Sequence, residues 1–250
     1  MRASSFLHCA LLLLPAGLPS LALPPTVGTT ILSQASQAFS AGKAVTSVEL
    51  TGTAHWIAGS MKDSGPARLT AKITGENTAE FDLSNGTRIE KQSALTEERT
   101  CTWSGKDGVE HNVASANCWT ATVWFLPHLA LQSSGLPPTL RTQALVADKD
   151  HPTASRLTHQ VTIAPEGQSE ITELIRTWSK TDLTVDPSTY LPIVLKYAIY
   201  PDHHPGVTLQ IEIRYSNYKS VSGVELPMHI ERYVNGVLQV SMDIESAIVN

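Results

Sequence analysis

The spacing of the hydrophobic positions changes once, near the start of the chain. Between Thr30 and Ser40 apolar residues recur at helical spacing, with serine and glutamine on the opposite face and Gly42 closing the run. From Val45 onward apolar residues occupy every second position instead. The pattern predicts one amphipathic helix followed by β-strands.

Alternation of apolar and polar residues then recurs along most of the chain, as expected for strands with one buried and one solvated face. Clear runs lie at 45–56, 69–73, 79–83, 157–163, 193–199, 207–215, 226–230 and 238–248, a less regular one at 140–147, and one at 171–178 that fits helix or strand. Asn85-Gly86, expected as a type I′ turn, and Asn235-Gly236 are hairpin signals. We therefore predict an antiparallel sheet of about ten or eleven strands.

The segment Trp119–Leu131 breaks the pattern because it carries hardly any polar residue. Its length and lack of strict alternation predict a helix, kinked or divided at Pro127. A helix that is apolar on most sides must be surrounded by protein or cover an apolar opening. We expect it to pack, with the N-terminal helix, on the concave face of a strongly curved sheet, where it is a candidate lid.

The first residues have the features of an export signal. Arg2 is followed by a short apolar stretch that ends at Pro15, and small residues occupy the positions before a cleavage site after Ala22. The stretch is shorter than the roughly 20 residues that a membrane span needs. We expect residues 1–22 to be a signal peptide and residues 23–250 to form a single α+β domain, periplasmic or secreted.

Two cysteines remain after the expected cleavage, Cys101 and Cys118. In an oxidising compartment such a pair is read first as a structural disulfide. A zinc site and a redox pair stay open as alternatives, although the spacing fits neither pattern well. The sequence predicts a disulfide.

Composition narrows the function classes. Hydrophobic residues make up 42% of the chain and charged residues 16%, and the formal net charge is −5 without any block of like charge. Nucleic acid is not an expected partner, because a phosphate-binding surface needs clustered lysine and arginine.

No pattern for catalysis or metal binding stands out. The densest group among the nine histidines is Asp202-His203-His204-Pro205, which fits a polar surface turn better than a metal site. The chain has no nucleophile elbow, zinc-protease motif or phosphate-binding loop. We expect a protein that is not an enzyme and has no metal or cofactor.

Two stretches near the C-terminus resemble a known family. Tyr215–Pro227 reads YSNYKSVSGVELP, and Asp186–Pro192 reads DPSTYLP. Both are similar to motifs of the periplasmic lipoprotein carriers LolA and LolB. The resemblance implies a half-barrel whose apolar concave face, partly plugged by helices, receives acyl chains. The carriers have an Arg-Pro after their second strand that is tied to lipoprotein binding, whereas Lys72–Gly75 reads KITG here.

These observations leave two hypotheses for function. The first is a carrier or envelope sensor, monomeric and at most peripheral to the membrane, that holds a lipid or lipoprotein acyl chain in an apolar cavity. The second is an interaction module for another envelope protein, with the same residues simply forming a filled core. The candidate cavity residues are Trp56, Leu69, Ile73, Phe81, Trp124, Ile211, Ile213 and Met228.

Overall fold

The structure, a computed structural model, describes most of the expected domain. It covers residues 27–93, 100–118, 124–127, 140–147, 155–161, 170, 178, 180–201 and 206–250. The expected signal peptide, the ambiguous run at 171–177, the histidine cluster at 202–205 and most of the segment Trp119–Leu131 lie outside these residues. None of the described helices is long and apolar enough to cross a membrane.

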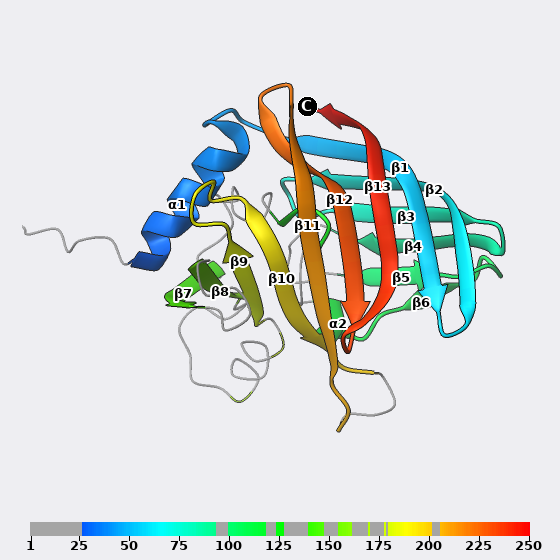
Figure 1. Cartoon of the computed structure of the whole chain (residues 1–250). Helices are drawn as coiled ribbons and strands as arrows, with labels where there is room; N and C mark the ends of the chain where they lie inside the picture. The colour runs from blue at the N-terminus through cyan, green and yellow to red at the C-terminus, as the bar shows by residue number, and fades with distance from the viewer. Residues whose placement is uncertain are drawn as a thin grey trace, which may run out of the picture.

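The described residues form one sheet of thirteen strands, in the order β6-β5-β4-β3-β2-β1-β13-β12-β11-β10-β9-β8-β7, with every neighbouring pair antiparallel (Figure 1). The first six strands are β1 (Ser47–Ala58), β2 (Met61–Lys72), β3 (Asn77–Leu83), β4 (Gly86–Gln92), β5 (Cys101–Ser104) and β6 (Glu110–Asn112). The others are β7 (Leu140–Ala147), β8 (Ser155–Val161), β9 (Thr181–Val185), β10 (Pro192–Ile199), β11 (Leu209–Val221), β12 (Val224–Val234) and β13 (Val237–Val249). The predicted antiparallel sheet is confirmed, and the described residues form thirteen strands where about ten or eleven were expected.

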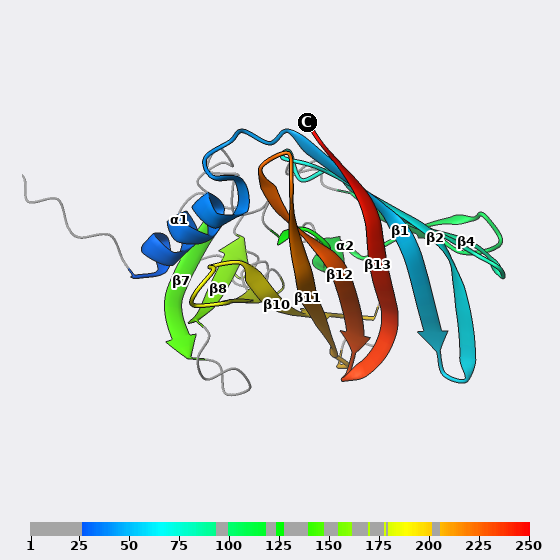
Figure 2. The same ribbon diagram turned by 45° about the horizontal axis from the view of Figure 1, so that its top comes forward.

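The sheet is open and strongly curved, as Figures 1 and 2 show from two directions. Helix α1 (Val27–Ser40) contacts β12 and also β7 and β8, although β9, β10 and β11 separate these strands in the sheet. The sheet therefore bends around the helix. Ala35 and Phe39 of α1 are fully buried in the same core as the sheet residues.

Strand register explains part of the curvature. The pairing of β1 with β13 shifts at Thr51/Gly52, where a β-bulge bends the strand. A Cβ atom on Gly52 would lie 2.0 Å from the carbonyl oxygen of Asp243. Glycine is required here because the neighbouring backbone approaches too closely for any side chain.

The two predicted hairpin turns have different geometries. Asn235 and Gly236 both have positive φ, 48° and 78°, as a two-residue type I′ turn requires. In the earlier hairpin Leu83 pairs with Gly86, so the turn residues are Ser84 and Asn85, and in this turn only Gly86, with φ 115°, has a positive value. The hairpin is confirmed, but its predicted type I′ geometry was wrong.

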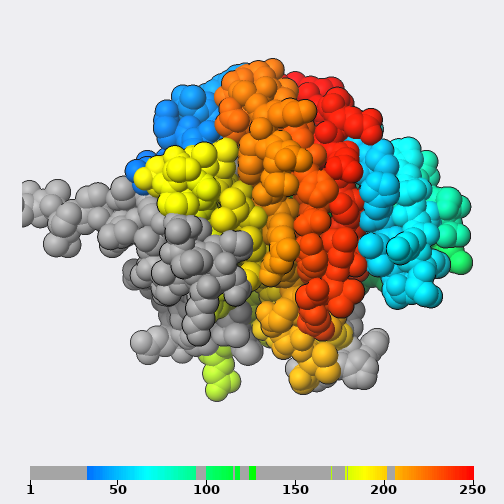
Figure 3. All heavy atoms as spheres, viewed as in Figure 1, coloured from blue at the N-terminus to red at the C-terminus, as the bar shows by residue number. Residues whose placement is uncertain are grey.

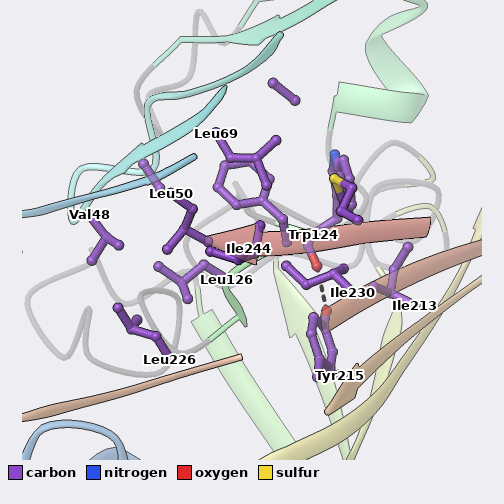
Figure 4. Close-up of a cluster of buried hydrophobic side chains, with 14 of the residues drawn as sticks. Val48, Leu50, Leu69, Trp124, Leu126, Ile213, Tyr215, Leu226, Ile230 and Ile244 are labelled. Atoms are coloured by element: carbon purple, nitrogen blue, oxygen red, sulfur yellow. Dashed lines mark hydrogen bonds between the residues drawn. The ribbon is translucent and has the colours of Figure 1, made fainter. Parts of the chain in front are cut away.

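The centre of the concave face is filled by a short piece of the segment Trp119–Leu131. Trp124 and Phe125 lie in a turn and Pro127 is the first helical residue, so the predicted helix does not extend through 124–126. Proline suits the first helical position, where its missing N–H is not needed. Phe125 and Leu126 are fully buried, and Leu126 lies among core side chains from several strands (Figure 4).

The opposite, outer face of the sheet is polar. Glu212 on β11 binds Arg214 Nε at 2.6 Å through Oε1 and Lys196 Nζ at 3.5 Å through Oε2. Figure 3 shows this side of the molecule, over which β11, β12 and β13 lie side by side. These charged residues occupy the strand positions whose side chains point to solvent, away from the core.

Candidate functional site

The concave side contains a cavity of about 410 Å³ that is partly open to solvent. This volume lies within the range of about 300–1,000 Å³ that is usual for small-molecule sites. Residues from β1, β3, β4, β5 and from β10 to β13 line it, together with Val113, Asn117 and Trp124. The cavity therefore lies between strands that are far apart in the sheet and face each other across the curve.

The two walls of the cavity differ in character. One wall, from β10 to β12, carries Tyr197, Ile199, Leu209, Ile211 and Val234. The facing wall, from β4 and β5, carries more polar side chains. Its inward positions are Arg88, Glu90, Gln92, Cys101 and Trp103. A cavity with one apolar and one polar wall suits a ligand that is itself part apolar and part polar.

Arg232 of β12 extends into the cavity and binds the facing wall. Its Nη1 and Nη2 donate to Glu90 Oε2 and Oε1 of β4, each at 2.9 Å. Arg232 is only 7% exposed, and in the sheet it lies opposite Val240 and Ile213, in an otherwise apolar row. This bidentate geometry is the strongest arrangement for an arginine and a carboxylate.

Aromatic rings enclose the two arginines of the cavity. The guanidinium carbon of Arg232 lies 4.7 Å from the ring centroid of Trp124 and 5.4 Å from that of Trp56. The guanidinium carbon of Arg88 lies 5.1 Å from the Trp56 centroid. Both distances to Trp56 fall within the range of cation–π contacts. Both guanidinium groups therefore lie near the same ring, that of Trp56.

Burial and the ion pair set the charge states in the cavity. Burial alone would lower the pKa of the Arg232 guanidinium, but the charge and hydrogen bonds of Glu90 outweigh it and raise that pKa above its usual value. Burial raises the pKa of Tyr197 far above its usual value, with Arg232 opposing the shift and Glu90 adding to it. At neutral pH Arg232 is charged and the Tyr197 hydroxyl is neutral.

A hydrogen bond from β11 holds the turn at Trp124, which forms the floor of the cavity. The buried hydroxyl of Tyr215 donates a hydrogen bond to the backbone carbonyl of Trp124, as the dashed line in Figure 4 marks. Tyr215 belongs to β11 and lies opposite Ile230 of β12 in the sheet. The bond therefore fixes the turn at Trp124 to β11. The floor of the cavity is therefore anchored to the sheet.

The two cysteines lie beside a common neighbour. Gln92 Nε2 lies 3.4 Å from Cys101 Sγ and 3.1 Å from the carbonyl oxygen of Cys118. Cys118 ends the short helix α2 (Ser115–Cys118), and Val113 N donates to the Cys101 carbonyl at 2.9 Å. The segment between the cysteines thus folds back on itself, and the disulfide stays a prediction.

The eight candidate residues from the sequence fall into three places. Trp56, Trp124 and Ile211 line the cavity. Leu69, Phe81, Ile213 and Met228 are buried in the hydrophobic core. Ile73 is partly buried after the end of β2, where its N–H binds the Thr46 carbonyl. The structure brings the first three together at the cavity that also contains Arg232.

The charged residues of the cavity were not predicted from the sequence, although the alternation along β12 and β4 places them at inward positions. On β12 the buried phase Leu226, Met228, Ile230 continues to Arg232, which puts an arginine at an inward position. On β4 Arg88 and Glu90 lie opposite the buried Phe81 and Ala79. A charge on the apolar phase of a strand is therefore the pattern that could have identified them.

Comparisons with known proteins bear on the fold. No family model matches the chain, and no curated protein matches its sequence. A domain described as an outer membrane lipoprotein-sorting protein, from Vibrio parahaemolyticus, superposes with a TM-score of 0.53 at 10% identity, covering 88% of this chain and 91% of that one. A LolA superfamily protein from Nitrosomonas europaea gives 0.52 at 13% identity, with 90% and 94% covered.

The chain has the LolA fold. A DUF1329 family protein from Desulfovibrio piger shares it as well, with a TM-score of 0.52 at 10% identity and 89% and 92% of the two chains covered. The resemblance found in the two C-terminal motifs is confirmed at the level of the fold. In this LolA-type half-barrel the cavity arginines are Arg88 and Arg232, whereas Lys72 lies outside and pairs with Glu76 at 2.7 Å.

Proposed function

We propose that this protein is an exported, periplasmic carrier or sensor that holds the acyl chain of a lipid or lipoprotein in the concave cavity of its half-barrel. It acts by binding and not by catalysis. The observation that carries the proposal is the cavity of about 410 Å³ between a wall of aliphatic and aromatic side chains and a more polar wall. The LolA fold and the lipoprotein-sorting description of a structural neighbour support it.

The energetics favour an acyl ligand. Each methylene group moved from water into an apolar site contributes about 0.8 kcal/mol. Ile199, Leu209 and Ile211 offer such a surface without requiring hydrogen bonds from the ligand. The turn at Trp124 and Phe125 would form the inner end of the site.

The test is uptake of a labelled phospholipid and of an acylated peptide by delipidated protein. Ile199→Trp fills part of the cavity, so it should reduce uptake strongly. Val237→Trp adds the same side chain on an exposed hairpin, where Val237 is 67% exposed, and should bind as the wild type does. Equal uptake by both variants, or no uptake by the wild type, would contradict the proposal.

Native mass spectrometry of protein isolated from its own envelope tests the alternative function. Co-purified lipid supports the carrier. A stoichiometric protein partner without lipid supports the interaction module, in which side chains fill the concave face.

A further inference from the structure

The two arginines of the cavity do not have equivalent partners. Both Nη atoms of Arg232 bind Glu90. Arg88 lies against the ring of Trp56, and among the residues that the structure describes no carboxylate pairs with it. The buried Nε atoms of Arg88 and Arg232 both lack a hydrogen-bond acceptor within the described part of the chain. Arg88 is partly buried as a residue, but its buried Nε is a charged donor without an acceptor, which is unfavourable.

The charge balance of the cavity is positive. Glu90 is the one acidic residue among its described lining residues, and both of its oxygens are taken by Arg232. Lys91 also borders the cavity, but its ammonium group lies 3.5 Å from Glu110 on the outer side of β4. Arg88 therefore remains as the cation whose charge no described residue neutralises, and a cationic ligand would find no free carboxylate.

We propose that the occupant of the cavity is an amphiphile with an anionic head group, a carboxylate or a phosphate ester. Its head group binds Arg88 beside Trp56, and its alkyl chain lies along the wall of Ile199, Leu209 and Ile211. The Arg232–Glu90 pair lies between the two ends and carries no net charge. This inference rests on the proposed function and adds the chemical class of the ligand.

The experiment compares ligands that share one alkyl chain. Dodecanoate, dodecyl phosphate, dodecanol and dodecyltrimethylammonium are titrated below their micelle-forming concentrations at pH 8, with tryptophan fluorescence or calorimetry as the readout. Acetate and inorganic phosphate are the controls without a chain. We expect dodecanoate, dodecyl phosphate or both to bind about tenfold or more tightly than dodecanol, as a charge-assisted hydrogen bond provides, and the preference between them identifies the head group.

Two variants assign the effect to Arg88. Arg88→Gln should remove the preference for the anions over dodecanol. Arg68→Gln is the matched control, because Arg68 is an exposed arginine that binds Glu49 at 2.9 Å outside the cavity. If Arg88→Gln fails to fold, added salt should weaken the binding of dodecanoate by wild-type protein and leave dodecanol binding unchanged.

Three results would overturn the proposal. Dodecanol could bind as tightly as the anions, dodecyltrimethylammonium could bind more tightly, or acetate or phosphate alone could bind as well as their dodecyl forms. In each of these cases the carrier function survives or is tested separately by lipid uptake. If none of the dodecyl compounds or lipids binds, the carrier function itself is contradicted.

Discussion

Arg232 and Glu90, 142 positions apart in the sequence, are joined by two parallel hydrogen bonds across the inside of the half-barrel. Their strands are not neighbours, since β3, β2, β1 and β13 lie between β4 and β12 in the sheet. The planar guanidinium fixes both the distance and the orientation of the two walls. The pair is therefore a brace that holds the curve of the sheet at the cavity.

Breaking this brace on one side should destabilise the protein. Glu90→Gln leaves the buried Arg232 charge without a counter-charge, and we expect a loss of about 2 kcal/mol of unfolding free energy, moderated because the Glu90 side chain is 35% exposed. The double variant Glu90→Leu/Arg232→Met should be close to wild type, because an apolar pair of similar size replaces the ion pair. Urea unfolding measures both, and a single variant as stable as the wild type would contradict the brace.

Strands β5, β6 and β9 were not predicted, because their residues do not show a recognisable alternation of apolar and polar positions. β6 has three residues, all exposed, and β5 has four, too few to establish alternation. In β9 the last three residues, from Leu183 to Val185, are all buried. A strand that is covered on both faces loses the alternation on which its prediction depends.

Alternation predicts which residues of the candidate site face inward, but not which of them line the cavity. Alternation places Trp56 and Ile211 on the inner face, and the apolar segment that contains Trp124 was expected on that side, although as a helix. Which inner residues line a cavity and which fill the core depends on how tightly the sheet curves, and no local pattern encodes this. The contact of Glu90 with Arg232 follows from the same curvature.

The hydrogen bond from Tyr215 to Trp124 should hold the floor of the cavity. Tyr215→Phe leaves the Trp124 carbonyl without this donor, which we expect to cost about 1–3 kcal/mol of unfolding free energy. Tyr233→Phe is the control, because its hydroxyl binds the partly exposed carboxylate of Glu231, and a change within about 0.5 kcal/mol is expected there. Equal effects of the two variants in thermal unfolding would argue against a special role of Tyr215.

Leu126 should be a major contributor to the core. Its side chain is fully buried on the concave face, so Leu126→Ala removes apolar contacts and leaves a cavity, at a cost of about 2–5 kcal/mol. Val237→Ala, at a position that is 67% exposed, should change the unfolding free energy by less than about 0.5 kcal/mol. If urea unfolding gave a small effect for Leu126→Ala, the turn at 124–127 would not be a fixed part of the core.

The two cysteines should form a disulfide in the exported protein. Protein isolated without reductant should then show no thiol that reacts with an alkylating reagent after unfolding. Cys101→Ser/Cys118→Ser should lower the unfolding free energy by about 3 kcal/mol, as the chain-entropy model gives for a loop of this length. Two reactive thiols in such protein, or a metal bound in their place, would rule the disulfide out.

Asp63 should make the β3–β4 hairpin sensitive to acid. Its carboxylate accepts hydrogen bonds from the Ser84 hydroxyl at 2.5 Å and the Ser84 and Asn85 N–H groups, each at 3.1 Å. The Ser84 hydroxyl has the largest effect, and together with the N–H groups of Asn85 and Ser64 it lowers the pKa of Asp63 from 3.8 to about 2. Because the folded pKa is the lower one, the stabilisation is present above about pH 4 and is lost as the pH falls through about 2.

The difference in urea midpoint between wild type and Asp63→Asn should therefore be constant at neutral pH and shrink between about pH 4 and pH 2. Ser84→Ala removes the strongest donor, so an NMR titration of the Asp63 carboxyl in this variant should give a pKa closer to the usual value. The hydrogen bonds shown here would not be the cause if Ser84→Ala left the titration of Asp63 unchanged. A stability difference that persisted undiminished at about pH 2 would place the effect of Asp63 in its packing and not in its charge.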